Sequence, residues 1–247
     1  NATGVKNLVK NHIDVDYAVF GEPSGIKQVT IAYKGRLAIN LKVSVEDSAH
    51  ASAPWLSKNA IEETMIFAKE LKEGLESDQE KKSKGMLLTV TLTEIDGGTS
   101  HNVTPKECVS TFDIRIPVDT NCKIVEQKIS GLVNEIAQRR KVEAYYSIID
   151  ETEPFEAPHD SAIVRAFTLG IMDIEHTRPT LIRKTGTGDM NVMGNQWKIP
   201  GVTYGPGDPH QAHTIDERVS IDEYLRGIEI LKRMIHHLKR LHDKSIQ

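Results

Sequence analysis

The sequence predicts a two-domain α/β protein in which a domain with the element order βαββαβ is inserted into another α/β domain. Two observations predict this. Strand-like and helix-like periodicities alternate through the middle of the chain, whereas both flanking regions show a short strand leading into a Gly/Pro-rich loop. We expect the flanking α/β domain to comprise residues 1–30 and 153–247 and the inserted domain residues 31–152. The 247 residues are enough to form packed cores in both domains.

The first flanking region is predicted to contain a short helix and a strand. Apolar residues at helical spacing within 5–11 suit one or two helical turns, and residues 15–20 form a β-rich apolar run. This run stops at the turn signal of residues 21–25, which contains Glu22. A carboxylate at the end of a strand can bind a cation, and the alternative is that Glu22 is an ordinary turn residue.

The inserted domain shows four strand-like and two helix-like segments. Period-2 alternation predicts half-buried strands at 37–45, 88–93, 111–116 and 142–148, and apolar residues at helical spacing predict helices at 59–74 and 125–136. Asn59 with Glu62 resembles a capping box that begins the first of these helices. The order βαββαβ is that of a ferredoxin-like sandwich of one sheet and two helices.

The second flanking region returns to the strand–loop–helix pattern. It is predicted to contain a helix around 163–169, a strand at 180–184, a Gly-rich loop at 185–189, a short strand at 202–204 and a loop over 205–214. Ser220 with Glu223 predicts a capping box for the last helix. The apolar residues of that helix are expected to face inward: Tyr224, Leu225, Ile228, Leu231, Ile235 and Leu238.

Composition narrows the class of protein. Hydrophobic residues at 38% and charged residues at 27% are typical of a soluble globular protein, and no apolar run approaches the roughly 18 residues of a membrane span. The net charge of −4 and the 5% aromatic content argue against a nucleic-acid partner, including an RNA-binding role for the ferredoxin-like domain. The two cysteines favour a reducing, cytoplasmic location over a disulfide scaffold.

Two histidines and one arginine stand out as candidates for chemistry. His213 lies in a long loop before a capped helix, where imidazole is a common metal ligand; His210 is a rival in that loop, and a structural role is equally compatible. His50 is surrounded by small residues that leave room for a substrate or a partner chain, or it is simply a turn residue. Arg115 lies in a strand, either as an exposed partner of nearby acidic groups or as a bidentate clamp for a carboxylate.

Eight short motifs follow one another along nearly the whole chain. They are Gly21-Glu-Pro-Ser24, Tyr33-Lys-Gly-Arg36, Ala49-His-Ala-Ser-Ala-Pro54, Asn59-Ala-Ile61, His101-Asn-Val-Thr-Pro105, Phe112-Asp-Ile-Arg115, Gly186-Thr-Gly-Asp189 and Gln211-Ala-His213. In this order they resemble the zinc aminoacylase and carboxypeptidase family. That family includes acetylornithine deacetylase, succinyl-diaminopimelate desuccinylase and the hydrolase that releases lysine or ornithine from its carrier protein. Residues 183–187 and 204–208 resemble the acetylornithine and lysine-biosynthesis branch.

The resemblance implies a metal centre. Glu22 resembles the carboxylate ligand of one zinc ion and His213 the imidazole ligand of the other, so that an intact subunit would hold two zinc ions, with cobalt as a possible substitute. In the family, the other metal-site elements, a His-x-Asp motif, a bridging Asp and a Glu-Glu pair that includes the general base, lie upstream of the stretch that these motifs cover, and the resemblance implies that this chain lacks them. We therefore expect the chain to begin just after the Glu-Glu pair and to be inactive by itself.

The resemblance also implies roles for residues that hold the substrate. His50 resembles the histidine of the inserted domain that reaches across a homodimer to the scissile carbonyl, and Asn102 resembles a second residue supplied across that dimer. Arg115, with Gly186 and Thr187, resembles the group that holds the substrate carboxylate. The inserted domain would thus serve as both lid and dimerisation domain.

The expected activity is metal-dependent hydrolysis of an amide. The predicted substrates are N-acyl amino acids such as acetylornithine or acetyl-lysine, in arginine or lysine biosynthesis. One alternative is a metallo-carboxypeptidase or dipeptidase of the same family. The other is a non-catalytic fragment whose ferredoxin-like domain serves only for dimerisation.

Overall fold

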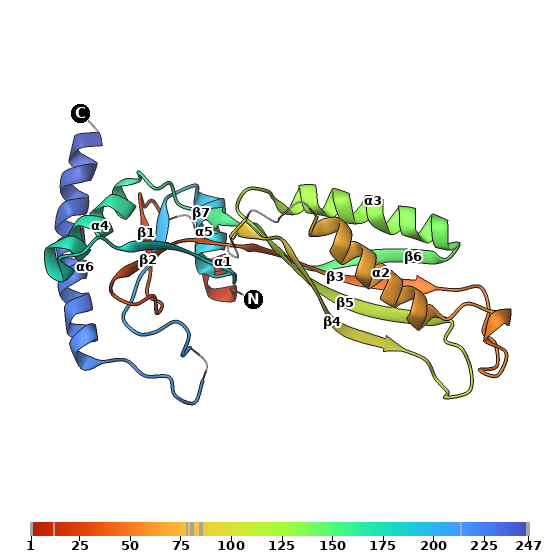
Figure 1. Cartoon of the computed structure of the whole chain (residues 1–247). Helices are drawn as coiled ribbons and strands as arrows, with labels where there is room; N and C mark the ends of the chain where they lie inside the picture. The colour runs from red at the N-terminus through yellow and green to blue at the C-terminus, as the bar shows by residue number, and fades with distance from the viewer. Residues whose placement is uncertain are drawn as a thin grey trace. The chain divides into compact units, whose positions relative to one another are not determined.

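The chain divides into two units by the contacts among its residues: residues 1–34 with 155–247, and residues 35–154. Figure 1 presents the computed structural model, which describes residues 2–11, 13–77, 79, 82–83, 86–212 and 214–245. The expected boundaries, after residues 30 and 152, lie a few residues before the observed ones. Among the described helices, none combines the length and the apolar character needed to cross a membrane.

The inserted unit has the element order that the sequence predicts. Its elements are β3 (Gly35–Ser44), the 3₁₀-helix η1 (Pro54–Leu56), α2 (Ala60–Leu75), β4 (Thr89–Gly97), β5 (Glu107–Ile116), α3 (Cys122–Arg140) and β6 (Glu143–Thr152). All neighbouring strands pair antiparallel, in the order β4-β5-β3-β6. This is the ferredoxin-like arrangement, so the expected fold of the inserted domain is confirmed.

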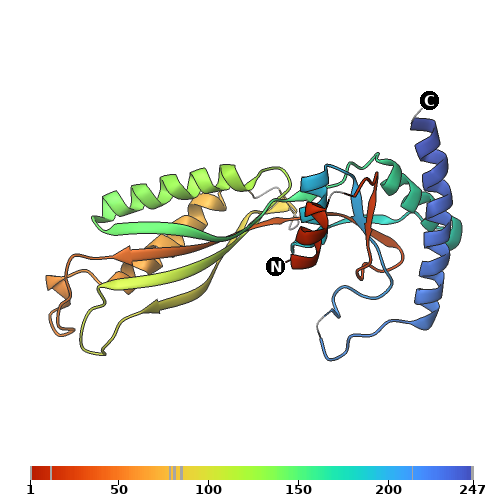
Figure 2. The same ribbon diagram turned by 180° about the vertical axis from the view of Figure 1, so that it is seen from behind.

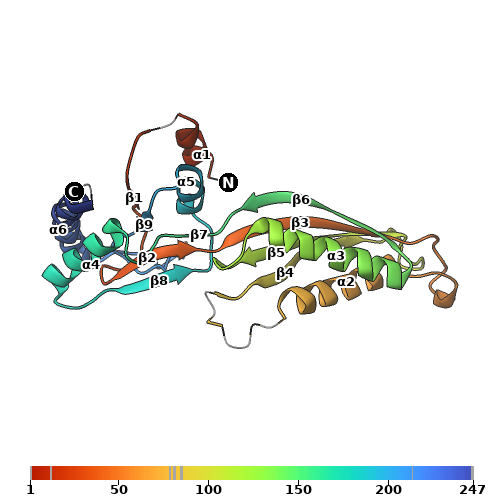
Figure 3. The same ribbon diagram turned by 90° about the horizontal axis from the view of Figure 1, so that it is seen from above.

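Alternation along the strands gives this sheet one buried face. Leu37 and Leu41 of β3 and Phe112 of β5 are buried in one hydrophobic core with Phe67 of α2 and Ile129 of α3. Both helices therefore pack against the same face of the sheet, and Figure 3 shows them next to each other along the strands. Burial of each such side chain stabilises the fold by roughly 1.5–3 kcal/mol.

Asparagine side chains begin both helices of this unit. The Asn59 Oδ1 accepts hydrogen bonds from the backbone N–H groups of Ile61 at 3.0 Å and Glu62 at 3.4 Å, at the helix start that the sequence predicts. Asn121 caps α3 in the same way, by accepting from the N–H of Ile124 at 2.9 Å. These bonds satisfy N–H groups that have no partner inside the helix.

The flanking unit is a mixed α/β assembly. Its elements are α1 (Thr3–Lys10), β1 (Ala18–Phe20), β2 (Gln28–Tyr33), β7 (Phe155–Glu156), α4 (Ala162–Glu175), β8 (Thr180–Lys184), α5 (Asp189–Trp197), β9 (Gly201–Thr203) and α6 (Ile221–Ser245). Strand β1 pairs parallel with β9, whereas β2 pairs parallel with β8 and antiparallel with β9 and β7. The two-domain α/β fold class is thereby confirmed.

Helices α4 and α6 pack closely in the flanking unit (Figure 2). A β-carbon at Gly170 of α4 would lie 3.0 Å from the backbone of α6 at both Ile230 and Met234. Ile230 and Met234 are accordingly among the residues that α6 buries, at 0% and 4% exposure.

The inward face predicted for α6 is wrong in part. Tyr224, Leu225 and Ile235 were expected to face inward and are 51%, 56% and 62% exposed. The apolar residues of α6 lie on two stripes of the helix, and the stripe that contains Ile230 is the one that packs against α4.

Candidate functional site

Strand ends bring four side chains of the flanking unit together. Tyr33, Lys184 and Thr203 are the last residues of β2, β8 and β9, and Glu22 lies two residues beyond β1. The pairing of the strands places these residues near one another. Tyr33 pairs with Lys184 across β2 and β8, and Thr203 at the end of β9 pairs with Thr30 on β2. Side chains from segments distant in the sequence therefore surround one carboxylate.

The loop that carries Glu22 is fixed to the loop that follows β9. Ser24 is fully buried; its N–H donates to the Gly205 carbonyl at 3.0 Å, and the Gly205 N–H donates to the Ser24 Oγ at 3.1 Å. A β-carbon at Gly205 would lie 2.7 Å from the Glu22 carbonyl oxygen, so only glycine permits this approach. The loop that starts at Gly205 leads to His213, which lies outside the described residues.

Tyr33 makes the main polar contact with the Glu22 side chain. Its hydroxyl donates to the Glu22 Oε2 at 2.8 Å and lies 3.3 Å from the Thr203 Oγ1. Burial raises the pKa of Tyr33 well above its usual range, and the nearby Glu22 carboxylate adds to this rise. The hydroxyl therefore remains a proton donor at every physiological pH.

Lys184 supplies a positive charge beside the same carboxylate. Its Nζ lies 3.9 Å from the Glu22 Oε2, donates to the Pro23 carbonyl at 3.1 Å, and lies 5.6 Å from the centre of the Tyr33 ring. Burial lowers the pKa of Lys184, and Glu22 opposes that effect. Glu22 itself is partly exposed, with 42% of its side chain accessible, so the pair is open to solvent on one side.

The predicted Gly-rich loop adjoins this carboxylate. Gly186 and Thr187 lie in the connection from β8 to α5, and a β-carbon on the next residue, Gly188, would lie 3.7 Å from the Glu22 Oε1. The loop is held by Asn191 of α5, whose Oδ1 accepts from the Gly188 N–H at 2.9 Å and whose Nδ2 donates to the Lys34 carbonyl at 3.1 Å. The structure thus brings Glu22 and Gly188 together, and the roles of Gly186 and Thr187 stay predictions.

His50 and Asn102 form a second cluster, in the inserted unit. The loops after β3 and before β5 pair through a bridge between His50 and Val103, and the Ala51 N–H donates to the Asn102 carbonyl at 2.8 Å. The side chains of His50 and Asn102 belong to exposed residues. The two residues expected to act across a dimer therefore lie side by side on the surface.

A hydrogen bond fixes which nitrogen of His50 carries the proton when the ring is neutral. The Ser52 backbone N–H donates to the Nδ1 at 3.2 Å, and the Ser52 Oγ lies 2.7 Å from the same atom. Because Nδ1 accepts from this N–H, the hydrogen of the neutral ring is assigned to Nε2. The Nε2 of His50 then carries an N–H donor that takes no part in the two Ser52 contacts.

Arg115 lies in the inserted unit, away from the His50 loop. Its Nε and one terminal nitrogen donate to the two oxygens of Asp113, at 2.6 and 3.0 Å, on the same face of β5. Arg115 pairs with Arg36 at the start of β3, whereas the His50 loop follows the other end of that strand. The guanidinium is thus already occupied by an internal carboxylate, which matches the ion-pair alternative; its role as a substrate clamp stays a prediction.

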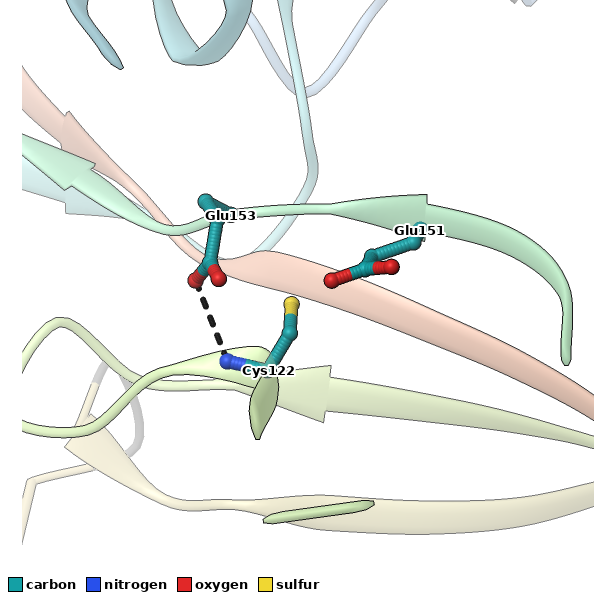
Figure 4. Close-up of side chains that lie close together, drawn as sticks. All are labelled: Cys122, Glu151 and Glu153. Atoms are coloured by element: carbon teal, nitrogen blue, oxygen red, sulfur yellow. Dashed lines mark hydrogen bonds between the residues drawn. The ribbon is translucent and has the colours of Figure 1, made fainter. Parts of the chain in front are cut away.

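A group of three possible metal ligands lies elsewhere in the inserted unit. Figure 4 shows the Cys122 thiol directed between Glu151 and Glu153, and the ligand atoms of these residues lie within 4.8 Å of one another. The Glu153 Oε2 accepts from the Cys122 backbone N–H at 3.0 Å, and the thiol contacts the Thr152 carbonyl at 3.5 Å. Burial, with the carboxylates of Glu153 and Glu151, raises the pKa of the Cys122 thiol, so a cap on α3 explains this group without a metal.

Sequence reasoning missed the residues around Glu22. Tyr33 and Lys184 fall within two of the quoted motifs, Tyr33-Lys-Gly-Arg36 and the stretch 183–187, but neither was a candidate. For Lys184, its position at the end of the predicted strand 180–184 was an available signal, because side chains at strand ends gather at one edge of a sheet. Tyr33 gave no such signal, because the strand that it ends was not predicted. Which strand ends meet depends on the sheet order, which the sequence pattern does not specify.

Comparison with known proteins supports the same family. Residues 31–141 match a family described as the peptidase dimerisation domain of the M20 type. A LysW-lysine/LysW-ornithine hydrolase of Saccharolobus islandicus is 26% identical over 235 residues, which is 95% of this chain and 62% of that protein. A protein of Thermococcus kodakarensis provisionally given the same name is 31% identical over 247 residues, covering 99% of this chain and 61% of that protein.

Solved structures share the fold of the chain. A tripeptidase of Staphylococcus aureus matches with a TM-score of 0.79 at 18% identity, over 97% of this chain and 61% of that one. An M20 family metallo-carboxypeptidase of Sulfolobus solfataricus matches with a TM-score of 0.71 at 16% identity, over 95% and 66% of the two chains.

Residues 31–141 are thus a peptidase dimerisation domain of the M20 type. Together with the similarity to these hydrolases along most of the chain, this match supports the resemblance of its motifs to the zinc aminoacylase and carboxypeptidase family. The chain spans about three fifths of the length of these curated relatives, 61–62%.

Proposed function

We propose that this chain is part of a metal-dependent amide hydrolase that releases an amino acid from an N-acyl or isopeptide-like linkage. The observation that carries this proposal is the likeness to LysW-lysine/LysW-ornithine hydrolases across 95–99% of the chain. Those proteins are named for lysine or ornithine attached to LysW, so a carrier-linked diamino acid is a substrate class to test beside acetylornithine and acetyl-lysine. Either class places the enzyme in lysine or arginine biosynthesis, in the cytoplasm.

The proposed metal centre includes Glu22. Its carboxylate suits a divalent cation, and Gly188 leaves room beside the Oε1 because it has no side chain. His213 is the second proposed ligand. Within the described residues, Glu22 belongs to no group of three possible metal ligands, so these residues supply only one ligand of such a centre. When bound, a zinc or cobalt ion would polarise the amide carbonyl and acidify a bound water.

His50 is proposed to stabilise the negative charge that develops on the carbonyl oxygen. Its Nε2–H is free of the Ser52 contacts, which both involve Nδ1, and an N–H donor at that position suits an oxyanion. The dimerisation domain that contains His50 supports a homodimer in which this donor and Asn102 serve the site of the partner subunit.

Arg115, Gly186 and Thr187 are proposed to hold the substrate carboxylate. Gly186 and Thr187 precede Gly188, whose β-carbon would lie 3.7 Å from the Glu22 Oε1, and this supports the role for the loop. Arg115 would have to exchange its bidentate pairing with Asp113 for the substrate, which is chemically matched because both partners are carboxylates.

Hydrolysis rates distinguish the proposed function from its two alternatives. The whole enzyme of which this chain is proposed to be part is purified with Zn²⁺ or Co²⁺ and assayed on acetylornithine, acetyl-lysine, LysW-linked lysine and a dipeptide. We expect the largest kcat/KM on an N-acyl or carrier-linked diamino acid, and His50→Ala should lower kcat by roughly 10²–10³-fold.

Two other outcomes would replace this proposal. Fastest turnover of the dipeptide would assign the protein to the carboxypeptidase or dipeptidase alternative. Absence of turnover on all four substrates, together with no bound metal, would identify a non-catalytic dimerisation fragment.

A further inference from the structure

We propose that Ser52 is a positioning residue for His50, and that its hydroxyl holds the imidazole ring so that the Nε2–H keeps one orientation toward the substrate's carbonyl oxygen. The inference rests on the proposed function, because it takes His50 as the donor to that oxygen. Both residues are exposed, so packing against the core does not hold the ring. The orientation of the ring depends instead on hydrogen bonds to its neighbours.

The backbone is fixed on both sides of His50. On one side, the Ala49 N–H donates to the Thr104 Oγ1 at 2.7 Å, and the Thr104 N–H donates to the Ala49 carbonyl at 2.8 Å. Thr104 is 6% exposed, so this contact is anchored at a buried residue of the inserted unit. On the other side, the Ala51 N–H donates to the Asn102 carbonyl at 2.8 Å. The main freedom left to His50 is therefore rotation of its side chain.

A tight turn brings Ser52 back to the His50 ring. The Ala53 N–H donates to the His50 carbonyl at 2.8 Å, which closes a four-residue turn over residues 50–53. Within this turn, the Ser52 backbone nitrogen lies 3.2 Å and the Ser52 Oγ 2.7 Å from the His50 Nδ1. Two contacts on one ring atom restrict the rotation that the backbone leaves free.

The two Ser52 contacts differ in what they can do. A backbone N–H only donates, so it serves the ring only while the Nδ1 is unprotonated. A hydroxyl both donates and accepts, so the Ser52 Oγ can donate to the neutral ring and accept from the protonated ring. The hydroxyl is therefore the contact that suits His50 in both protonation states. Stabilisation of an oxyanion depends on a donor that is oriented before the reaction, which is what this contact provides.

NMR relaxation of the His50 ring tests the positioning in this chain. We expect the order parameter of the ring C–H bonds to fall from about 0.8 in the wild type to below about 0.6 in Ser52→Ala, because the hydroxyl contact is lost. Ser52→Thr keeps a hydroxyl and should retain the wild-type value. Ser57→Ala is the matched control, because Ser57 lies in the same connection between β3 and α2 but its Oγ donates to the Asp47 carbonyl.

Three NMR results would overturn the proposal. The first is a ring that is already mobile in the wild type, and the second is an order parameter that Ser52→Ala leaves unchanged. The third is an equal fall in Ser57→Ala or in Ser52→Thr, because the cause would then be the loop as a whole or the substitution itself rather than the hydroxyl.

Kinetics of the whole enzyme gives a second readout that a merely structural role would not change. Ser52→Ala should lower kcat roughly 3–10-fold, the effect of one hydrogen bond, and leave KM within a factor of about two. The split is expected because the donor acts on charge that develops in the transition state. Ser52→Thr should retain most of the wild-type kcat, and Ser57→Ala all of it. A rise in KM with no change in kcat in Ser52→Ala would contradict the inference.

His50→Ala separates failure of this inference from failure of the proposed function. If His50→Ala lowers kcat and Ser52→Ala does not, the donor role of His50 stands and the positioning role of Ser52 is wrong. If His50→Ala leaves kcat unchanged, His50 is not the donor, and its proposed role falls together with that of Ser52. If the whole enzyme hydrolyses none of the four substrates, the proposed function falls, and this inference falls with it whatever the mobility of the ring.

Discussion

At the scale of single residues, Cys122 illustrates how an environment can make a reactive group inert. The thiol is 1% exposed at the start of α3, and Glu151 and Glu153 face it. A thiolate there would lose hydration and meet two negative charges, so burial raises the pKa, and the carboxylates add to the rise. The folded state therefore keeps a proton that the unfolded state releases more readily.

This difference predicts alkaline destabilisation that depends on Cys122. Below the unfolded thiol's ordinary pKa of 9.0, both states are protonated and the contribution to stability is complete. As the pH rises above that value, the unfolded state loses its proton first, so the free energy of unfolding falls by at most about 1.4 kcal/mol per pH unit. Cys122→Ser removes the titrating group and should flatten this decline.

Urea unfolding of both proteins from about pH 7 to about pH 10.5 measures the effect. Tyr33 and Tyr204, whose pKa values burial also raises, are present in both proteins and cancel in the comparison. Stability curves that remain parallel across this range would contradict the prediction.

The residue scale also shows how far the sequence alone could go with the site. Glu22 was a candidate because a carboxylate in a turn after a strand is visible locally. Tyr33 and Lys184 were not, because nothing near them in the sequence indicates that β2 and β8 end beside the loop after β1. The roles of His50 and Asn102 across a dimer came from the family resemblance, whereas guanidinium chemistry had already suggested a carboxylate clamp at Arg115; all three roles stay predictions.

At the scale of elements, the sequence predicts best the helices and strands that have one buried and one exposed face. β3 alternates because only one of its faces meets the helices, and its period is plain in the sequence. β2 was missed because five of its six residues are buried, so it has no alternation to detect. α5 was missed because Gly194 and two asparagines weaken its helical signal.

The close packing of α4 on α6 predicts how a substitution at Gly170 changes stability. Gly170→Ala should destabilise the flanking unit by about 1–3 kcal/mol, because the new β-carbon would lie 3.0 Å from the backbone of α6, which cannot move aside as a side chain can. Thermal unfolding followed by circular dichroism measures the change.

Gly131→Ala in α3 is the matched control for this substitution. A β-carbon at Gly131 has no neighbour within 4 Å among the described residues, so alanine should stabilise that helix by about 0.5–1 kcal/mol. A similar gain for Gly170→Ala would contradict the close packing of α4 on α6.

At the scale of the whole molecule, the match to a dimerisation domain predicts that two subunits associate. We expect a particle of about twice 27.6 kDa in analytical ultracentrifugation, because residues 31–141 match a peptidase dimerisation domain. A monomer at micromolar concentration would contradict this expectation.

Mixed dimers test whether His50 acts on the partner subunit. In an active preparation, His50→Ala and Glu22→Gln each inactivate the protein, but a mixed dimer keeps one site with an intact His50 and an intact Glu22. After subunit exchange of equal amounts, about a quarter of the wild-type activity should return, because half of the dimers are mixed and each has one working site. No recovery in a mixture shown to exchange would place both residues in the same subunit's site.

The pairing of β2 with β7 has a consequence for how the inserted domain can be moved. Tyr33 and Phe155 are direct partners across these antiparallel strands, so the insertion leaves and re-enters its host at neighbouring positions. If residues 35–154 were deleted, β2 and β7 would be the two arms of a hairpin needing only a short turn. The inserted domain therefore takes the place of a hairpin turn, a position at which chains tolerate insertions. We expect that another domain can replace it without a change in the strand pairing of the sheet next to Glu22.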